Sequence, residues 1–449
     1  MRLQFWFLVF AGIISCHLTA GFSRAQTLAD PSVTNEDNFG FSVAIHDSFI
    51  IVGDPRDDLA STNVGRAHLY STVDGVLLRS FDDPTETTQD NFGAAVGVDE
   101  QYVVVGAPQD STQGPLVGQA YLFDANSGAL SHTFDDPTSS SADFFGAAVD
   151  VDGPYVVVGA PGDDSDGFGI GQAHIFSTET GQLLHTLQDP TVTGFDSFGT
   201  SVAIEGEFVL VGDPGDDTFG FGVGAAHMFN AETGDFIRTY NDPTNTGSDE
   251  FGSSVSLSNG LVLVGAPGDD TLGSNIGQAY LFDADTGSLL QTLNAPNPSD
   301  EDDFGRSVAL SGTLALVGAP NGESESGANA GQAFLFDALA GTLRQTFEQA
   351  DGQAGDSTGF SVAIAGNIVT IGSPFSNADG TDSGSASRFE VSTVVKGDVN
   401  LDGTVDLLDI APFVSVISRG DFQAEADIDC NGMADLLDVE PFVDLLTGA

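Results

Sequence analysis

The chain has 449 residues, 41% of them apolar, and 66 acidic against 11 basic side chains give it a formal net charge of −55. Nucleic acid is an unfavourable partner for such a surface, because phosphate binding needs a positive footprint. Charges of one sign repel each other at low ionic strength and are screened by salt, which favours a saline or calcium-rich medium.

The amino terminus has the pattern of a secretory signal. Met1-Arg2 is followed by an apolar run from Leu3 to Ile14 and then by Ser23-Arg24-Ala25, where cleavage after Ala25 is expected. We therefore predict a signal peptide over residues 1–25, and a secreted or cell-surface location for the mature chain. A lipoprotein signal ending at Cys16 is the alternative. The apolar run is too short to span a bilayer, and no other segment approaches that length.

A repeat dominates the chain from residue 26 to residue 395. A Phe-Gly step recurs every 53 residues, and a seventh, degraded copy begins at Thr358-Gly359. A period of this length with glycine punctuation is typical of a solenoid or a propeller. The six complete copies of the step start at Phe39, Phe92, Phe145, Phe198, Phe251 and Phe304.

Each copy predicts four short strands. Residues 92–98 alternate between apolar and polar, as a strand with two unlike faces does, whereas 102–105 are apolar on both faces and indicate a strand between neighbouring sheets. A third strand is expected at 118–123 and a fourth at 129–134, after a turn at Gly128. Seven such copies without helical periodicity predict an all-β, seven-bladed propeller of four-stranded blades. A linear β-solenoid is the competitor, although its coils are normally shorter.

The two ends of the repeat predict how the ring closes. The seventh copy has strand patterns at 360–364, 368–371 and 386–389, but no fourth strand follows. Residues 26–31 resemble the end of a fourth strand, such as residues 185–190. We therefore expect the amino-terminal strand to complete the last blade, which removes the exposed edges of an open array.

Polar residues that recur in the copies are interpreted as parts of the fold. An Asp lies two residues before the Phe-Gly position in every copy, and we expect it to accept backbone N–H groups in a turn rather than to bind a metal. These residues are Asp37, Asp90, Asp143, Asp196, Asp249, Asp302 and Asp356.

Three histidines share one position of the third strand, which is aromatic in other copies, so aromatic packing is expected there and not a metal or catalytic role. The residues at this position are His68, Tyr121, His174, His227, Tyr280 and Phe334. The loops between the second and third strands vary most and are acidic, as at 54–58, 163–166 and 215–217. They fall on one rim, where they are either solvated charge or a surface for a basic partner or cations.

Two motifs of the repeat resemble a known family. Phe39-Gly40, Val52-Gly53-Asp54-Pro55 and Val105-Gly106-Ala107-Pro108 resemble the FG-GAP repeat of the integrin alpha-subunit propeller, over roughly residues 26–395. The resemblance implies a seven-bladed propeller used for binding or adhesion. Integrin blades hold calcium in an Asp-rich loop between the first two strands, but here hairpins such as Asp99-Glu100 are too short to wrap the ion. No cofactor is therefore predicted in the blades.

The carboxyl-terminal segment 396–449 carries two loops with the ligand spacing of a calcium site. Oxygen ligands fall at regular positions of each loop, with backbone carbonyls offered by Thr404 and Met433, and the spacing predicts two calcium ions. The ligands of the first loop are Asp398, Asn400, Asp402, Thr404, Asp406 and Asp409. Those of the second loop are Asp427, Asp429, Asn431, Met433, Asp435 and Asp438.

Each loop runs into an apolar segment, 407–417 or 436–446, that we expect to be a helix. Two calcium loops each followed by one helix resemble a type I dockerin, which implies docking to a cohesin domain of a scaffold or cell-surface protein. The positions where dockerins often carry polar recognition residues are Leu407-Leu408 and Leu436-Leu437 here. The partner is therefore a divergent cohesin, another apolar groove, or none.

These patterns favour a secreted, monomeric, non-enzymatic protein whose propeller binds an extracellular protein or a glycan. The alternative is a polysaccharide-degrading enzyme, because dockerins usually carry such enzymes. The sequence shows no carboxylate pair in a distinctive, non-repeated context, which glycoside hydrolysis needs, and no Ser-His-Asp constellation. A structural component of a surface layer or matrix is the third possibility.

Overall fold

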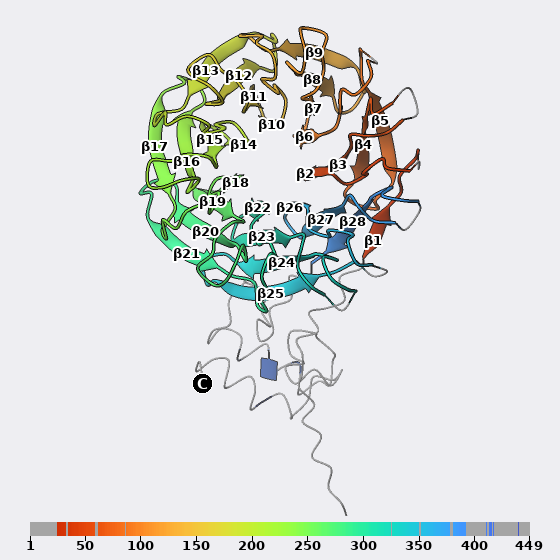
Figure 1. The fold of residues 1–449 in the computed structure, drawn as a ribbon. Coiled ribbons are helices and arrows are strands. Elements are labelled where there is room, and N and C mark those ends of the chain that lie inside the picture. Colours follow the sequence, from red (N-terminus) through yellow and green to blue (C-terminus); the bar gives the residue numbers. More distant parts are fainter. Residues whose placement is uncertain are drawn as a thin grey trace, which may run out of the picture. The chain divides into compact units, whose positions relative to one another are not determined.

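The computed structural model describes residues 25–32, 35–58, 62–85, 87–324, 326–349, 352–377 and 380–391, and the single residues 410, 413, 414, 416 and 439. In this part of the chain, 28 strands form seven antiparallel, four-stranded sheets arranged as blades around a ring (Figure 1). The prediction of an all-β, seven-bladed propeller is therefore confirmed. The ring forms one compact unit, Arg24–Glu390.

The four strands of each blade follow one another from the centre of the ring to its outside (Figure 1). The innermost strands are β2 (Ser42–His46), β6 (Ala95–Val98), β10 (Ala148–Asp152), β14 (Ser201–Glu205), β18 (Ser254–Ser258), β22 (Ser307–Ser311) and β26 (Ser361–Ala365). The second strands are β3 (Phe49–Asp54), β7 (Tyr102–Ala107), β11 (Tyr155–Ala160), β15 (Phe208–Asp213), β19 (Leu261–Ala266), β23 (Leu314–Ala319) and β27 (Ile368–Ser373). The third strands are β4 (Arg66–Ser71), β8 (Gln119–Asp124), β12 (Gln172–Ser177), β16 (Ala225–Asn230), β20 (Gln278–Asp283), β24 (Gln332–Asp337) and β28 (Ser385–Glu390). The outermost strands are β5 (Leu77–Asp82), β9 (Leu130–Asp135), β13 (Leu183–Gln188), β17 (Phe236–Asn241), β21 (Leu289–Leu293), β25 (Thr342–Phe347) and β1 (Gln26–Leu28).

The innermost strands begin later than predicted. The alternation of residues 92–98 predicts a strand from Phe92, but β6 begins at Ala95. Phe92 makes only an isolated bridge to Gly65, and Gly93 has a φ of +96°. The prediction is wrong here because this φ turns the backbone out of the extended region, while the fully buried Phe92 side chain keeps the apolar pattern of a strand.

Two glycines of each copy bring consecutive blades into backbone contact. Gly212 lies in β15, and a Cβ atom added to it would overlap the carbonyl oxygen of Gly252 in the next blade. The same carbonyl accepts a hydrogen bond of 2.8 Å from Ser201 Oγ. Gly252 in turn donates its N–H to Gly265 of its own blade. The contact recurs at every junction, between Gly53 and Gly93, Gly106 and Gly146, Gly159 and Gly199, Gly212 and Gly252, Gly265 and Gly305, Gly318 and Gly359, and Gly372 and Gly40.

The apolar core lies between the blades. One cluster joins Val157 and Ile175 of one blade to Phe198, Val209 and Val211 of the next. The Phe of each Phe-Gly step is almost completely buried in such a cluster. Each blade therefore depends on its neighbour for burial of its apolar side chains, as expected for a repeat architecture.

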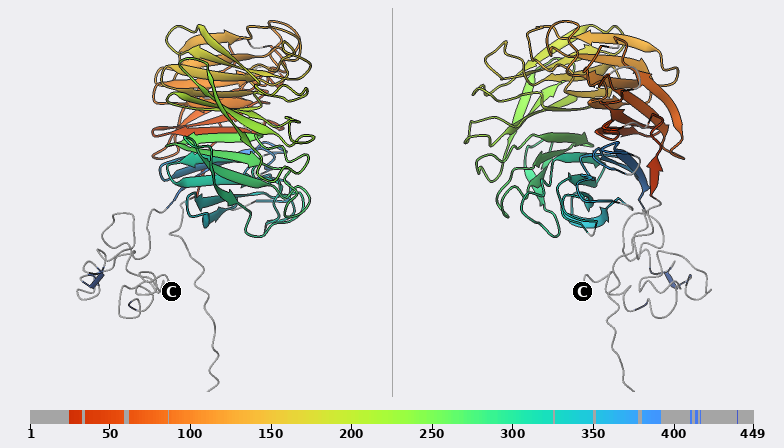
Figure 2. Two further views of the ribbon diagram at one scale, coloured as in Figure 1. Left: turned by 90° about the vertical axis from the view of Figure 1, so that its left-hand side faces the viewer. Right: turned by 45° about the vertical axis from the view of Figure 1, so that its right-hand side comes forward.

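The amino-terminal strand closes the ring, as predicted. β1 pairs antiparallel with β28, with Gln26 opposite Arg388 and Leu28 opposite Ala386. Leu28 is 1% exposed and packs in a cluster with Tyr70, whose hydroxyl donates to the Ala29 carbonyl at 2.8 Å. Figures 1 and 2 show β1, in red, against the blue strands of the last blade.

Two predicted segments lie outside the described residues. They are the signal peptide, with the alternative lipidation of Cys16, and nearly all of the calcium-loop segment 396–449. Both stay predictions. Among the described residues, no helix has the length and apolar character needed to cross a membrane.

The glycine contact predicts a position-dependent effect of alanine. Gly212→Ala forces β15 and the next blade apart, so we expect a loss of about 3 kcal/mol in the free energy of unfolding. Gly206→Ala is the control, because its φ is +59° but no atom lies within 4 Å of an added Cβ. That change costs only the left-handed strain of about 1 kcal/mol. Urea unfolding of the two variants measures the difference, and equal losses contradict the role given to the contact.

Candidate functional site

Acidic side chains cluster at five of the seven blade junctions described. The end of an outermost strand, the turn before the next innermost strand, and the loop after the next second strand meet on one face of the ring. At one junction this brings together Asp189, Asp196, Asp213 and Asp216. The groups whose ligand atoms lie within 4.8 Å of one another are Asp30, Asp54 and His68; Asp83, Asp90 and Asp110; Asp136, Asp163 and His174; Asp189, Asp213, Asp216 and His227; and Asp242, Asp249 and Asp269.

Local turns fix these carboxylates. Asp189 Oδ1 accepts hydrogen bonds from Thr191 N at 2.7 Å and Thr191 Oγ1 at 2.8 Å. The Thr191 hydroxyl also contacts Asp216 Oδ2, and Asp216 Oδ1 accepts from Thr218 N at 2.6 Å. The sequence Asp-Pro-Thr at the end of an outermost strand thus ties its own Asp to the loop of the next blade.

The Asp before the Phe-Gly step accepts a backbone N–H in the turn, as predicted, in four of the seven copies. Asp196 Oδ2 accepts from Thr193 N at 2.6 Å. The same bond to a backbone N–H three residues earlier is made by Asp143, Asp302 and Asp356. Asp90 and Asp249 accept from a threonine hydroxyl three residues earlier. These residues therefore support the fold, although Asp90 and Asp249 also belong to the acidic groups.

The third-strand aromatic position contacts the Phe of the Phe-Gly step, which confirms the predicted packing. The ring centroids of His227 and Phe198 are 5.8 Å apart, and those of Tyr280 and Phe251 are also 5.8 Å apart. The tyrosine and the histidine differ in what the outer atom of the side chain contacts. Tyr280 Oη donates to Asp269 Oδ2 at 2.5 Å, whereas His227 Nε2 lies 3.4 Å from Asp213 Oδ2.

Sequence reasoning missed this His–Asp pairing. His227 Nδ1 is hydrogen-bonded to Thr239 Oγ1 at 3.0 Å, so only Nε2 faces the carboxylates. The pair recurs at the closure, where His68 Nε2 lies 3.8 Å from Asp54 Oδ2. All four side chains are completely buried. Neither carboxylate oxygen of Asp54 or Asp213, nor Nε2 of either histidine, has a hydrogen-bond partner.

A signal for the pair does exist in the sequence. Asp54 and Asp213 end their second strands, and both stand in a copy with a histidine on the neighbouring strand. The other copies end this strand with Ala107, Ala160, Ala266, Ala319 and Ser373. Comparison of the copies strand by strand, rather than motif by motif, finds the coincidence.

Burial sets the protonation of these groups. Desolvation and the charges of Asp189, Asp196 and Asp216 raise the pKa of Asp213 well above its usual value. Desolvation lowers the pKa of His227 to about 4. Burial thus favours the neutral form of His227. Its Nε2 faces carboxyl groups, among them Asp213, whose charged form burial disfavours.

The two remaining junctions show that the acidic groups are not needed for blade packing. At the positions equivalent to Asp189 and Asp216, the sixth junction has Ala295 and Gly322. In the seventh, Gln349 Nε2 donates to Ser376 Oγ at 3.2 Å, which replaces the two carboxylates by a neutral pair. The carboxylates are lost together at these junctions, which indicates that they act as a group.

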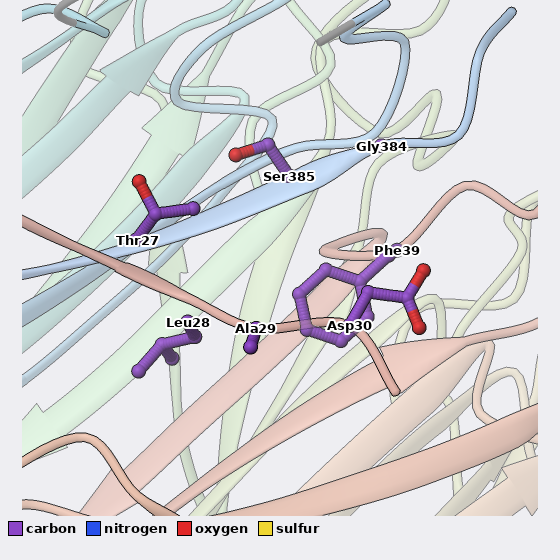
Figure 3. A pocket seen from close by; sticks show the side chains of 7 residues that line it. All are labelled: Thr27, Leu28, Ala29, Asp30, Phe39, Gly384 and Ser385. Atoms are coloured by element: carbon purple, nitrogen blue, oxygen red, sulfur yellow. The ribbon is translucent and has the colours of Figure 1, made fainter. Parts of the chain in front are cut away.

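A pocket opens beside the closing strand. It has a volume of about 260 Å³ and includes the half-buried Asp30 in its wall. Figure 3 shows Asp30 next to the Phe39 ring, with Gly384 and Ser385 on the facing segment. Of the acidic group at the closure, Asp30 lines this pocket, whereas Asp54 and His68 do not and are completely buried.

The rim above the junctions carries exposed phenylalanines that sequence reasoning did not single out. Phe168 and Phe221 are 70% and 80% exposed, and Phe195 and Phe219 are also exposed. We call these four residues the rim patch. They stand on the β11–β12 loop, the β13–β14 connection and the β15–β16 loop. The rings of Phe168 and Phe195 pack edge to face with centroids 5.1 Å apart. In the sequence, Phe168 and Phe221 each lie between two glycines.

The calcium ligands predicted between Asp398 and Asp438 all lie outside the described residues, so the structure neither assembles nor separates them.

Comparison with known proteins identifies the repeat. The family profile described as FG-GAP repeat matches residues 22–70, 86–123, 137–176, 188–229, 245–282, 288–336 and 342–389. These segments cover more than half of the chain, one in each copy, and the chain therefore belongs to the FG-GAP repeat family. No curated protein matches the chain.

The tyrosine junction predicts the cost of a lost phenol. Tyr280→Phe removes the shorter of two hydrogen bonds to the buried Asp269 Oδ2, which then keeps only the bond of 3.3 Å from Thr244 Oγ1. We expect a loss of about 2 kcal/mol in unfolding free energy. Tyr102→Phe is the control, because the Tyr102 hydroxyl only accepts from the exposed Gln101 side chain. Chemical denaturation of both variants checks this, and a neutral Tyr280→Phe speaks against the bond.

Proposed function

We propose that this FG-GAP repeat protein is a secreted, non-enzymatic binding protein that holds an extracellular partner on one rim of its propeller. The family and the fold support a role in ligand binding or adhesion. The observation that carries the proposal is the rim patch, because four phenylalanines on neighbouring loops face solvent in an otherwise acidic protein. Exposed apolar groups rimmed by charge are typical of interaction surfaces.

The loops that carry the patch are held in defined conformations. Asp164 Oδ1 accepts from Gly169 N at 2.6 Å, and Asp217 Oδ1 accepts from Gly222 N at 2.6 Å. Gly169 and Gly222 directly follow Phe168 and Phe221, and both have a positive φ, a backbone conformation that favours glycine. A preorganised loop loses less conformational entropy when a partner covers it. Burial of one such phenyl ring contributes about 2 kcal/mol.

The chemistry of the rim favours a basic partner. Phenyl rings beside carboxylates suit the guanidinium of Arg or the ammonium of Lys, through cation–π and charge interactions. The net charge of −55 attracts such a partner over a long range. We therefore propose a basic protein surface as the ligand, with a glycan as the alternative that the test must distinguish.

A binding experiment with the full-length protein tests the rim patch. Arrays of arginine- and lysine-rich peptides and of neutral glycans serve as probes. We expect binding to the basic peptides that weakens with salt, and at least a tenfold weaker affinity in the Phe168→Ser/Phe221→Ser variant.

Leu77→Ser and Leu184→Ser are the controls, because these leucines are exposed on β5 and β13, away from the rim. Equal affinities of the rim variant and the controls contradict the proposal. If the protein binds only the neutral glycans, the ligand is a sugar and not a basic protein surface.

We propose in addition that the carboxyl-terminal segment tethers the protein through two calcium ions and a cohesin-like partner. The support is the tandem ligand spacing from Asp398 to Asp409 and from Asp427 to Asp438. Calcium supplies folding free energy to a segment too short to bury a large core.

Calorimetric titration of chelator-treated full-length protein with calcium tests the tether. Asp398→Ala combined with Asp427→Ala removes the first ligand of each loop, so we expect the loss of two calcium ions per chain. Asp74→Ala, at an exposed turn of the first blade, leaves the count unchanged. Two ions retained by the double variant place calcium elsewhere.

A further inference from the structure

We propose that the two blade junctions with a His–Asp pair each bind a divalent first-row transition-metal ion. One site consists of Asp189, Asp213, Asp216 and His227, and we call it the His227 site. The other consists of Asp30, Asp54 and His68, and we call it the His68 site. The inference goes beyond the binding function of the rim and does not depend on it.

The spacing of the ligand atoms fits one ion. At the His227 site, Nε2 lies 3.4 Å from Asp213 Oδ2 and 4.0 Å from Asp189 Oδ1. All four ligand atoms lie within 4.8 Å of one another. In a tetrahedral zinc site with bonds of about 2.0–2.1 Å, neighbouring ligands are about 3.3 Å apart. Small side-chain rotations toward the centre bring the set to this geometry.

Buried atoms without partners point into the site. Both carboxylate oxygens of Asp213, Oδ2 of Asp189 and Nε2 of His227 have no hydrogen-bond partner, although Asp213 and His227 are completely buried. Buried polar atoms in native proteins are nearly always satisfied. The His68 site repeats the pattern with Asp54 and with Nε2 of His68.

The second nitrogen of each histidine is held as it is in metal sites. Nδ1 of His227 pairs with Thr239 Oγ1 at 3.0 Å, and Nδ1 of His68 pairs with Ser80 Oγ at 2.8 Å. A hydroxyl can accept a proton held at Nδ1, and in that tautomer the Nε2 lone pair is free for a metal. The ring packing on Phe198 or Phe39 fixes the orientation further.

Comparison with the other junctions separates a metal site from a packing device. The fifth blade has Ala266 and Tyr280 at the positions of Asp213 and His227, and its phenol donates to Asp269 Oδ2, which also accepts from Thr244 Oγ1. The fold is therefore built without the His–Asp pair in a neighbouring copy. A buried carboxylate is costly unless a proton or a cation neutralises it, and a cation would in addition give Nε2 of His227 the partner that it lacks.

The donor set selects the kind of ion. Calcium takes six to eight oxygen ligands, whereas imidazole nitrogen suits zinc and the later first-row ions. The histidines therefore distinguish these sites from the calcium loops proposed for the carboxyl-terminal segment. Zinc is the probe, because it has no redox chemistry of its own.

The test measures zinc bound to the full-length protein. Chelator-treated protein is loaded with Zn²⁺ in excess Ca²⁺, passed through gel filtration and analysed by elemental mass spectrometry. We expect two zinc ions per chain. Asp213→Ala/His227→Tyr copies the fifth blade, so the variant keeps the fold while the count falls to one. Adding Asp54→Ala/His68→Tyr lowers it to zero.

Controls separate specific sites from the acidic surface. We expect His174→Tyr to leave the count at two, because its group of Asp136, Asp163 and His174 has Ala160 in place of the strand-end Asp. Co²⁺ loading gives visible absorption bands that Asp213→Ala/His227→Tyr halves. No retained zinc, or a count unchanged by the paired substitutions in variants with the parent circular dichroism spectrum, overturns the proposal.

Discussion

The contact between two glycine backbones at each blade junction is the constraint on which the rest of the structure depends. Gly212 and Gly252 approach so closely that any side chain separates their blades, and the same contact joins Gly372 to Gly40 across the closure. Hydrogen bonds such as Gly252 N to Gly265 O link the glycine pairs within each blade. The result is a closed circuit of backbone contacts that fixes the spacing of all seven blades.

This constraint also explains where the acidic groups lie. Asp213 follows Gly212 directly in β15, and successive side chains of a strand point to opposite faces. Gly212 therefore faces Gly252 of the next blade, while the Asp213 carboxylate faces Asp189 and Asp196 of the preceding junction. The Phe of the Phe-Gly step is buried beside the same glycine and supports the aromatic ring of the third strand. The ring geometry thus brings the same three chain segments together at every junction, and each copy places a different set of side chains there.

The sequence predicted the architecture because burial and backbone freedom leave a strong pattern in it. Phe-Gly steps 53 residues apart, runs apolar on both faces and the divided last blade each report one requirement of a closed ring. The predicted start of the innermost strand was wrong, because Phe92 is buried like a strand residue while Gly93 turns the chain. Apolar periodicity reports burial and not hydrogen bonding of the backbone, so it cannot find this boundary.

The candidate site was only half predictable for a related reason. Packing of His227 on Phe198 followed from the aromatic residues at the same position in other copies, and the structure bears it out. The approach of Nε2 to Asp213 depends on strand register across two strands, which spacing alone does not give. The rim patch could not be predicted because Phe219 and Phe221 lie in a glycine-rich loop without strand or helix periodicity, and periodicity is what separates exposed from buried apolar residues in a sequence.

The His227 site and the rim patch are parts of one structure. Phe195 directly precedes Asp196, and Phe219 and Phe221 follow Asp216 on the same loop. Gly215 N donates to Asp196 O, and Asp217 N donates to Thr193 Oγ1, so the two loops are joined at the level of the carboxylates. An ion held by Asp189, Asp213 and Asp216 therefore crosslinks the bases of the loops whose tips carry the phenylalanines. The sixth and seventh junctions lack the equivalents of Asp189 and Asp216 and offer no such crosslink.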